Sequence, residues 1–186
     1  MQVIGTVGLP GSGKSEAAEV ARDLEIPVVT MGDVIREECR DRGLDPATYH
    51  GEIAGKLREE NGPGAIAQRS LPVVRDRLEE AETVLVDGIR SGTEVDIFED
   101  AFGGEFLLVR VEAPDEARAR RLDLRDRDAG ADEGGESLAE RDERELGFGM
   151  DEAMERANVD VDNDGSLQAF HERVRTLLTE GPEALA

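Results

Sequence analysis

The sequence predicts an α/β fold in which helices cover both faces of a mostly parallel β-sheet. Short apolar runs of strand length alternate with longer segments of helical periodicity, and a glycine-rich segment directly follows the first apolar run. The chain of 186 residues is long enough for one compact domain, and a second full domain is not expected. Strands that alternate with helices pair in parallel, so we expect ligands to bind where the carboxyl ends of the strands meet.

The first half of the chain opens with a β-α-β unit. Residues 3–7 form an apolar strand, apolar side chains recur at helical spacing over residues 17–24, and Pro27 separates this helix from the β-branched strand 28–30. Residues 32–78 are helical in pattern but interrupted, which predicts several short helices joined by hinges. The interruptions are Gly43, Pro46, Gly51, Gly55 and the cluster of Gly62, Pro63 and Gly64.

The second half continues the alternation. Its predicted strands are residues 83–86, 106–111 and 158–161, and its predicted helices are residues 118–128, 138–146 and 167–178. Ser137 and Glu140 have the spacing of a capping box at the start of the middle helix. The acidic stretch 129–136 has almost nothing to bury, which predicts a mobile loop. We interpret residues 125–150 as a short lid.

Acidic residues dominate the composition. Asp and Glu number 44 against 22 Lys and Arg, the formal net charge is -22, and Lys14 and Lys56 are the only lysines. Such a surface repels itself in dilute buffer and is relieved by salt, which favours a halophilic protein adapted to a concentrated-salt cytoplasm over an ordinary acidic one. The same charge disfavours binding to nucleic acids or anionic membranes by the surface as a whole, but it leaves room for a local basic cleft.

Residue usage also disfavours several other classes of protein. Cys39 is the only cysteine, so neither an intrachain disulfide nor a cysteine-rich zinc site can form. The chain enters its first strand without a basic and apolar leader, and no apolar run approaches the ~20 residues of a membrane span. We therefore expect a cytoplasmic protein with no membrane partner. The sequence leaves the oligomeric state open.

A phosphate-binding loop follows the first strand. Its residues match the pattern G-x-x-x-x-G-K-[ST] in full, and they are Gly8, Leu9, Pro10, Gly11, Ser12, Gly13, Lys14 and Ser15. A Cβ at one of the three glycines would block the approach of phosphates to the backbone N–H groups, or the required φ. Lys14 can reach the β- and γ-phosphates, while the Ser15 hydroxyl can ligate Mg²⁺ at the start of the next helix. The motif therefore predicts binding of Mg·ATP.

Two polar residues follow the strand that ends at residue 86. Asp87 stands where a P-loop protein needs a carboxylate to hold the water shell of magnesium, although an Asp before Gly88 also suits a simple turn. Arg90 would lie on the same lip, where it could bind the anionic group of an acceptor or form a surface ion pair.

Asp33 and Arg36 follow the second strand and fall near the same edge of the sheet. This position makes both of them candidates for binding the acceptor. Asp33 could also cap a helix that begins at Val34, and the two roles are compatible.

Arginines concentrate on both sides of the acidic stretch. They are Arg118, Arg120, Arg121, Arg125 and Arg127 before it, and Arg141 and Arg144 after it. Guanidinium groups on a closing flap could neutralise charge on a transferred phosphoryl group. Because Asp123, Asp126 and Asp128 interleave with the first group, a solvated, salt-bridged helix accounts for most of these arginines, and we expect only a minority to be catalytic.

Taken together, these residues resemble those of the nucleoside monophosphate kinases, adenylate kinase in particular, with dephospho-coenzyme A kinase as a near relative. The whole chain also resembles an archaeal family of P-loop kinase-like proteins. Adenylate kinases carry a Thr-Gly-Asp-x-x-Arg stretch whose arginine holds the acceptor phosphate, and residues 31–36 match it except that Met31 replaces the threonine. The resemblance implies this role for Arg36. The Asp-Gly-x-x-Arg segment of the family is similar to residues 87–90, which are one residue shorter and lack the proline.

The resemblance extends to the nucleotide side. The family has a Pro-Asp-Glu segment followed by an arginine that packs on adenine and another that faces phosphate, which is similar to residues 114–116 with Arg121 and Arg125. The loop whose backbone touches adenine in the family is similar to the stretch that contains Asn163 and Gly165. No Asn-Lys-x-Asp guanine signature is present, which argues against a GTPase.

The residues and the resemblance together imply a doubly wound P-loop NTPase fold over residues 1–186, with a helical acceptor-binding insert and a short lid. The expected activity is that of a kinase that transfers the γ-phosphoryl group of ATP to a small acceptor. Lys14, Arg121 and Arg125 would stabilise charge during transfer, while closure would exclude water.

The nature of the acceptor leaves alternatives open. Arg36 and Arg90 favour a nucleoside monophosphate. Asp33 as a catalytic base would favour a hydroxyl acceptor, because dephospho-coenzyme A kinases carry an aspartate at this position and a hydroxyl benefits from a nearby carboxylate. A slow ATPase switch that acts with a macromolecular partner is the third hypothesis.

Overall fold

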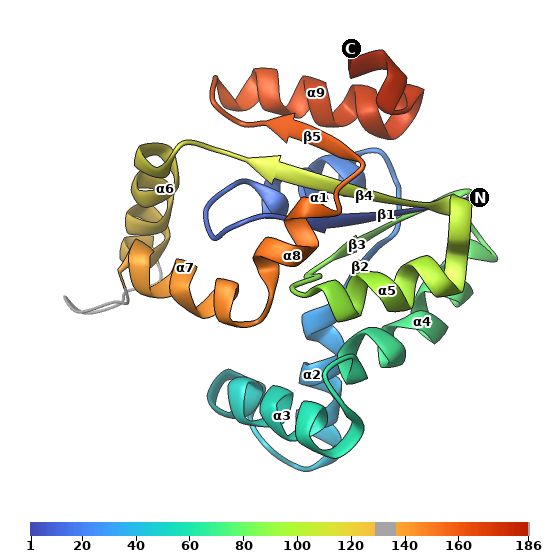
Figure 1. Ribbon diagram of the computed structural model, residues 1–186, viewed down its shortest axis with the longest axis vertical. Helices are drawn as coiled ribbons and strands as arrows, with labels where there is room; N and C mark the ends of the chain where they lie inside the picture. The colour runs from blue at the N-terminus through green and yellow to red at the C-terminus, as the bar shows by residue number, and fades with distance from the viewer. Residues whose placement is uncertain (129–136, 186) are drawn as a thin grey trace.

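Five parallel strands form the central sheet of the computed structural model, which describes residues 1–128 and 137–185, with the side chains of residues 125–128 left out (Figure 1). The strands lie in the order β2-β3-β1-β4-β5. They are β1 (Gln2–Val7), β2 (Val28–Thr30), β3 (Thr83–Asp87), β4 (Phe106–Glu112) and β5 (Val159–Asp162). The predicted α/β fold with a parallel sheet is thus confirmed.

Helices connect the strands. They are α1 (Lys14–Asp23), α2 (Met31–Asp41), α3 (Pro46–Asn61), α4 (Ala65–Leu78), α5 (Gly92–Phe102), α6 (Asp115–Asp128), α7 (Leu138–Gly147), α8 (Met150–Glu155) and α9 (Leu167–Glu180), with short 3-10 helices η1 (Gly103–Glu105) and η2 (Pro182–Leu185). Among the described residues, no helix is long and apolar enough to cross a membrane.

The register of the sheet places the glycine-rich loop at its centre. Thr6 on β1 is aligned with Asp87 on β3 and with Val109 on β4, so the loop that follows Val7 leaves the sheet between the ends of these two strands. The apolar residues of β1 are almost completely buried because helices cover both faces of the sheet. This central position brings segments from distant parts of the chain next to the loop.

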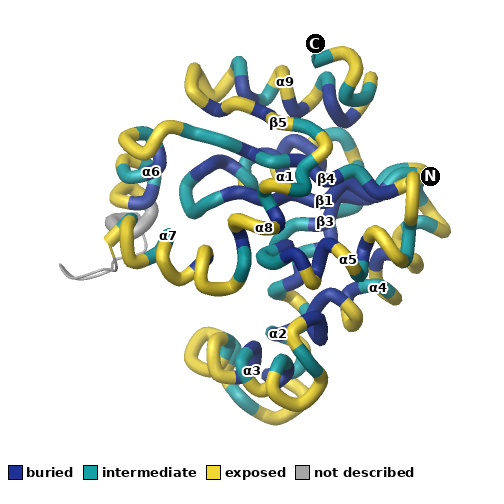
Figure 2. Tube along the Cα trace, in the orientation of Figure 1, coloured by how far each residue is buried: buried dark blue, intermediate teal, exposed yellow. Residues whose placement is uncertain are grey.

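Two apolar cores flank the sheet, one on each face. Helices α1 and α9 enclose the first, where Ala21 and Phe170 are at most 1% exposed. Helices α4, α5 and α8 enclose the second, in which Phe98 stacks on Phe106 with ring centroids 5.6 Å apart. Figure 2 shows buried residues concentrated in the strands and on the inner sides of these helices, whereas α3 and α7 are largely exposed.

The segment with many predicted interruptions forms three helices. Asp45 caps α3 with its side chain, and Pro46 occupies the first turn, where a missing N–H group costs nothing. The break at Gly62 also falls where it was expected. Figure 1 shows α2 and α3 projecting away from the sheet, on the side of β2.

Gly51 and Gly55 do not break the chain, contrary to expectation, because both lie inside α3. A Cβ at either position would meet no atom within 4 Å, so both glycines lie on an open side of the helix. Ile53 and Leu57 on α3 are completely buried, and this packing outweighs the roughly 1 kcal/mol that each glycine costs a helix.

Two helices of the second half were not predicted. Ser91 directly precedes helix α5 and caps it by accepting a hydrogen bond from the backbone N–H of Glu94. A serine in front of a segment with an apolar helical face is a signal that the sequence does contain. Helix α8 is only six residues long. The capping box of Ser137 and Glu140 is confirmed, and the stretch expected to be a mobile loop, residues 129–136, lies outside the described residues.

Candidate active site

A cleft with a volume of about 690 Å³ lies at the carboxyl end of the sheet. Its walls come from the glycine-rich loop, α2, α3, the segment between β3 and α5, and α7 with the residues that follow it. Six cationic side chains line it against three carboxylates, although the whole chain has a net charge of -22. The cationic residues are Lys14, Arg36, Arg58, Arg90, Arg141 and Arg144. A concave basic surface of this kind attracts anions.

The glycine-rich loop adopts a backbone that requires glycine. Its φ angles are 147°, 78° and 122° at Gly8, Gly11 and Gly13. A Cβ at Gly11 would approach the carbonyl oxygen of Arg118 to 2.8 Å, and one at Gly13 would overlap the side-chain nitrogen of Asn163. The predicted need for φ is confirmed, and the structure adds a second reason, since the loop packs tightly against α6 and the end of β5.

Lys14 begins α1 beside the cleft. Its ammonium group donates hydrogen bonds to the carbonyl oxygens of Gly8 and Leu9, the second at 3.3 Å. The loop therefore holds this charge close to its own backbone, next to the N-terminus of α1. A helix N-terminus with bare N–H groups and an adjacent ammonium group is suited to bind phosphates.

Ser15 and Asp87 line the same cleft as Lys14. The hydroxyl of Thr6 donates a 3.3 Å hydrogen bond to Asp87, which orients this carboxylate at the end of β3. No group of three His, Cys, Asp or Glu side chains within the described ranges could hold a metal ion by itself. A hydroxyl and a carboxylate nevertheless fit Mg²⁺, which keeps several waters and binds substrate phosphates through one or two protein ligands.

Asp33 and Arg36 occupy the first turns of α2, and the two side chains form an ion pair. Arg36 lines the cleft, whereas Asp33 does not, and the Asp33 side chain is 68% exposed. The expectation that Asp33 caps a helix beginning at Val34 is wrong. The helix begins at Met31, because the preceding residue, Thr30, is the last extended one.

Arg58 and His50 reach the cleft from α3, and sequence reasoning missed both. The Arg58 guanidinium lies 5.4 Å from the ring centroid of Phe148, in a cation–π contact that joins α3 to the segment after α7. Burial lowers the pKa of His50, and the neighbouring arginines add to this effect, so the neutral imidazole is favoured. No local sequence signal marks these residues, since only the placement of α3 brings them to the cleft.

Two buried carboxylates line the cleft beside Arg90. Glu94 is 1% exposed and accepts a 2.8 Å hydrogen bond from the backbone N–H of Arg90, and burial raises the pKa of Glu94. Glu145, from α7, is 6% exposed and accepts a 2.9 Å hydrogen bond from the Arg90 guanidinium. Arg90 thus lines the cleft, as its predicted role requires, and is bonded to both carboxylates.

Arg118 departs from the expectation of a solvated, salt-bridged helix, because it is 3% exposed. Its guanidinium donates to the carbonyl oxygen of Pro10 at 3.1 Å, to Asp142 at 2.8 and 2.7 Å, and to Asp115 at 2.8 Å. It therefore joins the glycine-rich loop, α6 and α7. Hydrogen bonds with Asp142, its largest favourable contact, raise the pKa of Arg118.

Arg121 and Asn163 together link the glycine-rich loop to the end of β5. The Arg121 guanidinium donates to the carbonyl oxygens of Gly11 and Ser12 at 3.1 and 3.2 Å and to the side chain of Asn163 at 3.0 Å. The Asn163 amide donates to Ser12 at 2.8 Å. These bonds brace the loop. Gly165 lies close by in the chain, with no atom within 4 Å of an added Cβ.

Three further arginines flank the acidic stretch, one before it and two after it. The Arg125 side chain lies outside the described part of the chain. Arg141 and Arg144 on α7 both line the cleft, as does the glycine-rich loop. The structure therefore brings to the cleft the two arginines that follow the acidic stretch, which the sequence could not assign.

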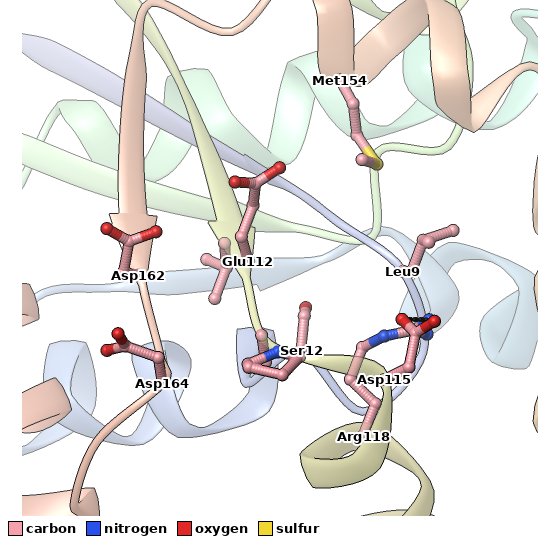
Figure 3. Close-up of a pocket in the computed structure, with 11 residues that line it drawn as sticks. Leu9, Ser12, Glu112, Asp115, Arg118, Met154, Asp162 and Asp164 are labelled. Atoms are coloured by element: carbon pink, nitrogen blue, oxygen red, sulfur yellow. Dashed lines mark hydrogen bonds and ion pairs between the residues drawn. The ribbon is translucent and has the colours of Figure 1, made fainter.

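A second pocket, of about 400 Å³, lies on the other side of the glycine-rich loop (Figure 3). Figure 3 shows carboxylates around it, which come from Glu112, Asp115, Asp162 and Asp164. Leu9 and Met154 contribute apolar surface. Carboxylates repel phosphates, so the phosphates of a nucleotide fit the larger basic cleft and not this pocket.

Comparison with known proteins shows the family and the fold of this chain. The family described as AAA domain matches residues 7–139. A UPF0200 protein from Halobacterium salinarum is 61% identical over 178 residues, which cover 96% of this chain and 93% of that protein.

Two kinases have a similar fold. A gluconokinase from Sinorhizobium meliloti superposes with a TM-score of 0.60 at 18% identity, covering 99% of this chain and 95% of that one. A shikimate kinase from Acinetobacter baumannii, solved in complex with shikimate, gives a TM-score of 0.58 at 17% identity, covering 97% and 94% of the two chains. At these identities the similarity shows the fold, a P-loop kinase fold, and leaves the acceptor to be argued from the cleft.

Proposed function

Because the chain belongs to the UPF0200 family and carries an AAA domain of the P-loop kinase fold, we propose that it is an ATP-dependent phosphotransferase. Its acceptor would be a small molecule with a phosphate group, such as a nucleoside monophosphate. One observation carries the proposal: the phosphate-binding loop and a group of arginines from other segments line a single cleft.

The nucleotide end would be formed by the glycine-rich loop. Lys14 would exchange its bonds to the loop carbonyls for bonds to the β- and γ-phosphates, since an ammonium group gains more from an anion than from a neutral carbonyl. Ser15 would ligate Mg²⁺ directly and Asp87 through water. The metal would supply neutralisation of charge on the phosphates. Arg121 and Asn163 would act indirectly, by bracing the loop, and this replaces the adenine contacts implied by resemblance.

The acceptor end would be formed by Arg36, Arg58 and Arg90, which come from three separate segments. In the transfer, an oxygen of the acceptor phosphate forms a bond to the γ-phosphorus of ATP, and the bond from that phosphorus to the β-phosphate oxygen breaks, releasing ADP. Arg141 and Arg144, which also line the cleft, would stabilise the negative charge that builds up during this exchange. A phosphate acceptor is already deprotonated at neutral pH, so no general base is required.

The position of Asp33 favours this acceptor over a hydroxyl. A general base must come within hydrogen-bonding reach of the proton that it removes. Asp33 is mostly exposed, pairs with Arg36 and does not line the cleft. We therefore propose that Asp33 orients Arg36. The alternative of a hydroxyl acceptor depended on Asp33 as the general base, and the position of Asp33 does not favour that role.

The test is a product assay with purified protein in concentrated KCl. Mg·ATP is incubated with a panel of nucleoside monophosphates and with dephospho-coenzyme A, and both ADP and phosphorylated acceptor are quantified, with Lys14→Ala as the inactive control. We expect product from a nucleoside monophosphate and none from the variant. ATP binding with no acceptor consumed would refute the kinase and favour a switch that acts with a macromolecular partner.

A further inference from the structure

The ion pair between Arg90 and Glu145 occupies the acceptor end of the cleft. Arg90 lies on the lip that follows β3, and Glu145 lies on α7, 55 positions later in the chain. The two groups are 2.9 Å apart, and the side chain of Glu145 is only 8% exposed. Both residues line the cleft. A carboxylate from the protein itself is thus bonded to an arginine that we assign to the acceptor's anionic group.

A second carboxylate and a second arginine lie beside this pair. Glu94 is buried beside Arg90, and the Arg58 guanidinium lies 3.9 Å from the Glu94 carboxylate. Arg58 is also held against the ring of Phe148, three residues after Glu145. These two arginines and two carboxylates form a compact cluster, which we call the four-charge cluster: Arg58, Arg90, Glu94 and Glu145.

A phosphate that bound Arg90 while Glu145 stayed in place would lie close to the carboxylates of Glu145 and Glu94, and like charges at short range repel each other. Glu145 can relieve this repulsion because its partner, Arg90, is half exposed, at 43%, and because Glu145 itself lines the cleft. Glu94 cannot, since it is bonded to the backbone N–H of Arg90 and is enclosed at the base of α5.

We propose that Glu145 is a built-in competitor for the acceptor: its carboxylate occupies the place of the acceptor's phosphate on Arg90, and a phosphate must displace it to bind. This inference rests on the proposed function and adds a specificity residue to it. Exchange of one carboxylate for another at Arg90 gains little, whereas a phosphate dianion brings a second charge and a third oxygen. The competitor therefore selects phosphate-bearing acceptors over carboxylate acids.

Displacement of Glu145 also couples the two ends of the cleft. Glu145 lies 3.9 Å from the guanidinium of Arg144, the neighbouring arginine on α7. When the acceptor takes over Arg90, the ion pair that joins α7 to the lip is broken. Arg144 then loses part of the negative charge beside it and offers a stronger positive field to the cleft.

The experiment measures binding of inorganic phosphate, the simplest probe with the proposed chemistry, by NMR titration at fixed KCl. The glycine-rich loop is first saturated with a non-hydrolysable Mg·ATP analogue, so that phosphate reports on the acceptor end. We expect Glu145→Gln to bind phosphate about tenfold more tightly than the wild type, because a bond to a charged group no longer has to be broken. Arg90→Lys should weaken binding in both backgrounds.

Glu143→Gln is the matched control, since it removes the same charge from an exposed position on the same helix. It should change the affinity less than twofold, roughly as for a screened surface charge. Glu145→Asp retains the charge but shortens the side chain, and its affinity should fall between those of the wild type and Glu145→Gln. This second variant also keeps the test decisive if Glu145→Gln does not fold.

The inference would be overturned if Glu145→Gln bound phosphate only as tightly as the wild type does. Weaker binding would also overturn it, and would indicate that Glu145 positions Arg90 for the acceptor. Equal gains in Glu145→Gln and Glu143→Gln would also overturn it, as an effect of net charge alone. The proposed function is tested separately by binding of the ATP analogue. If the analogue fails to bind, the same titrations are made in Lys14→Ala, which weakens phosphate binding to the loop.

Discussion

Replacement of Arg118 by methionine should destabilise the protein by about 3 kcal/mol. The guanidinium is almost fully buried and donates two hydrogen bonds to Asp142, one to Asp115 and one to the carbonyl oxygen of Pro10. The bond to Asp115 adds little, because that side chain is 85% exposed. The Asp142 carboxylate is 19% exposed and would lose its partner, which accounts for most of the cost. Methionine keeps the apolar packing of the side chain.

The assay is urea-induced unfolding at one KCl concentration, with thermal melting as a second readout. For a protein of this size, about 3 kcal/mol corresponds to a fall in Tm of roughly 6–12 °C. Arg120→Met is the matched control, because Arg120 is exposed and its guanidinium donates a 3.2 Å hydrogen bond to the carbonyl oxygen of Glu116 on its own helix. If Arg118→Met were within about 1 kcal/mol of this control, the idea that Arg118 joins the loop to α6 and α7 would be refuted.

Four further outcomes are expected. Burial raises the pKa of Glu94 above its ordinary 4.5, so the folded protein binds this proton more tightly than the unfolded chain, and stability is lost as pH rises from 4.5 through the folded-state value. Glu94→Gln should therefore unfold at higher urea than the wild type at neutral pH, with the advantage vanishing in acid. An anionic acceptor should raise the lowered pKa of His50. The measurement is an NMR titration of the imidazole with and without phosphate, and His50→Gln shows which signal belongs to His50 and which to His171. Gly13→Ala should lose about 3 kcal/mol or more from strain and overlap, while Gly165→Ala, in open space, should cost little in the same urea assay. The free energy of unfolding should rise between about 0.2 and about 3 M KCl, and a fall would contradict the halophilic interpretation of the charge of -22.

Local signals explain the parts of the fold that the sequence predicts well. The strands of the sheet are short apolar runs, which are stable only when they are buried. The glycine-rich loop carries a sequence motif that is typical of phosphate-binding loops. The capping box at Ser137 is a purely local device, and it forms as expected. The predicted breaks at Gly51 and Gly55 were wrong because the free energy that a glycine costs a helix is small compared with the gain from burying apolar side chains of α3.

The residues at the proposed acceptor end of the cleft are much harder to predict from local sequence signals. Arg36 and Arg90 were found because each follows a strand, and strand ends meet at a known edge. Arg58 and His50 lie in mid-helix, where an arginine or histidine is ordinarily a solvated surface residue. Their position over the cleft depends on how α3 packs against its neighbours, which is a long-range property.

The arginines around the acidic stretch show most clearly which features depend on local sequence and which depend on long-range packing. By itself, the sequence determined that the chain has a phosphate-binding loop on a parallel sheet, because backbone geometry and strand burial impose strict local patterns. Only the tertiary structure decided that Arg118 is a buried connector, that Arg121 braces the loop and that Arg141 and Arg144 line the cleft. A guanidinium group has the same chemistry in all these places, and its role is set by the partners that the fold brings within hydrogen-bonding distance.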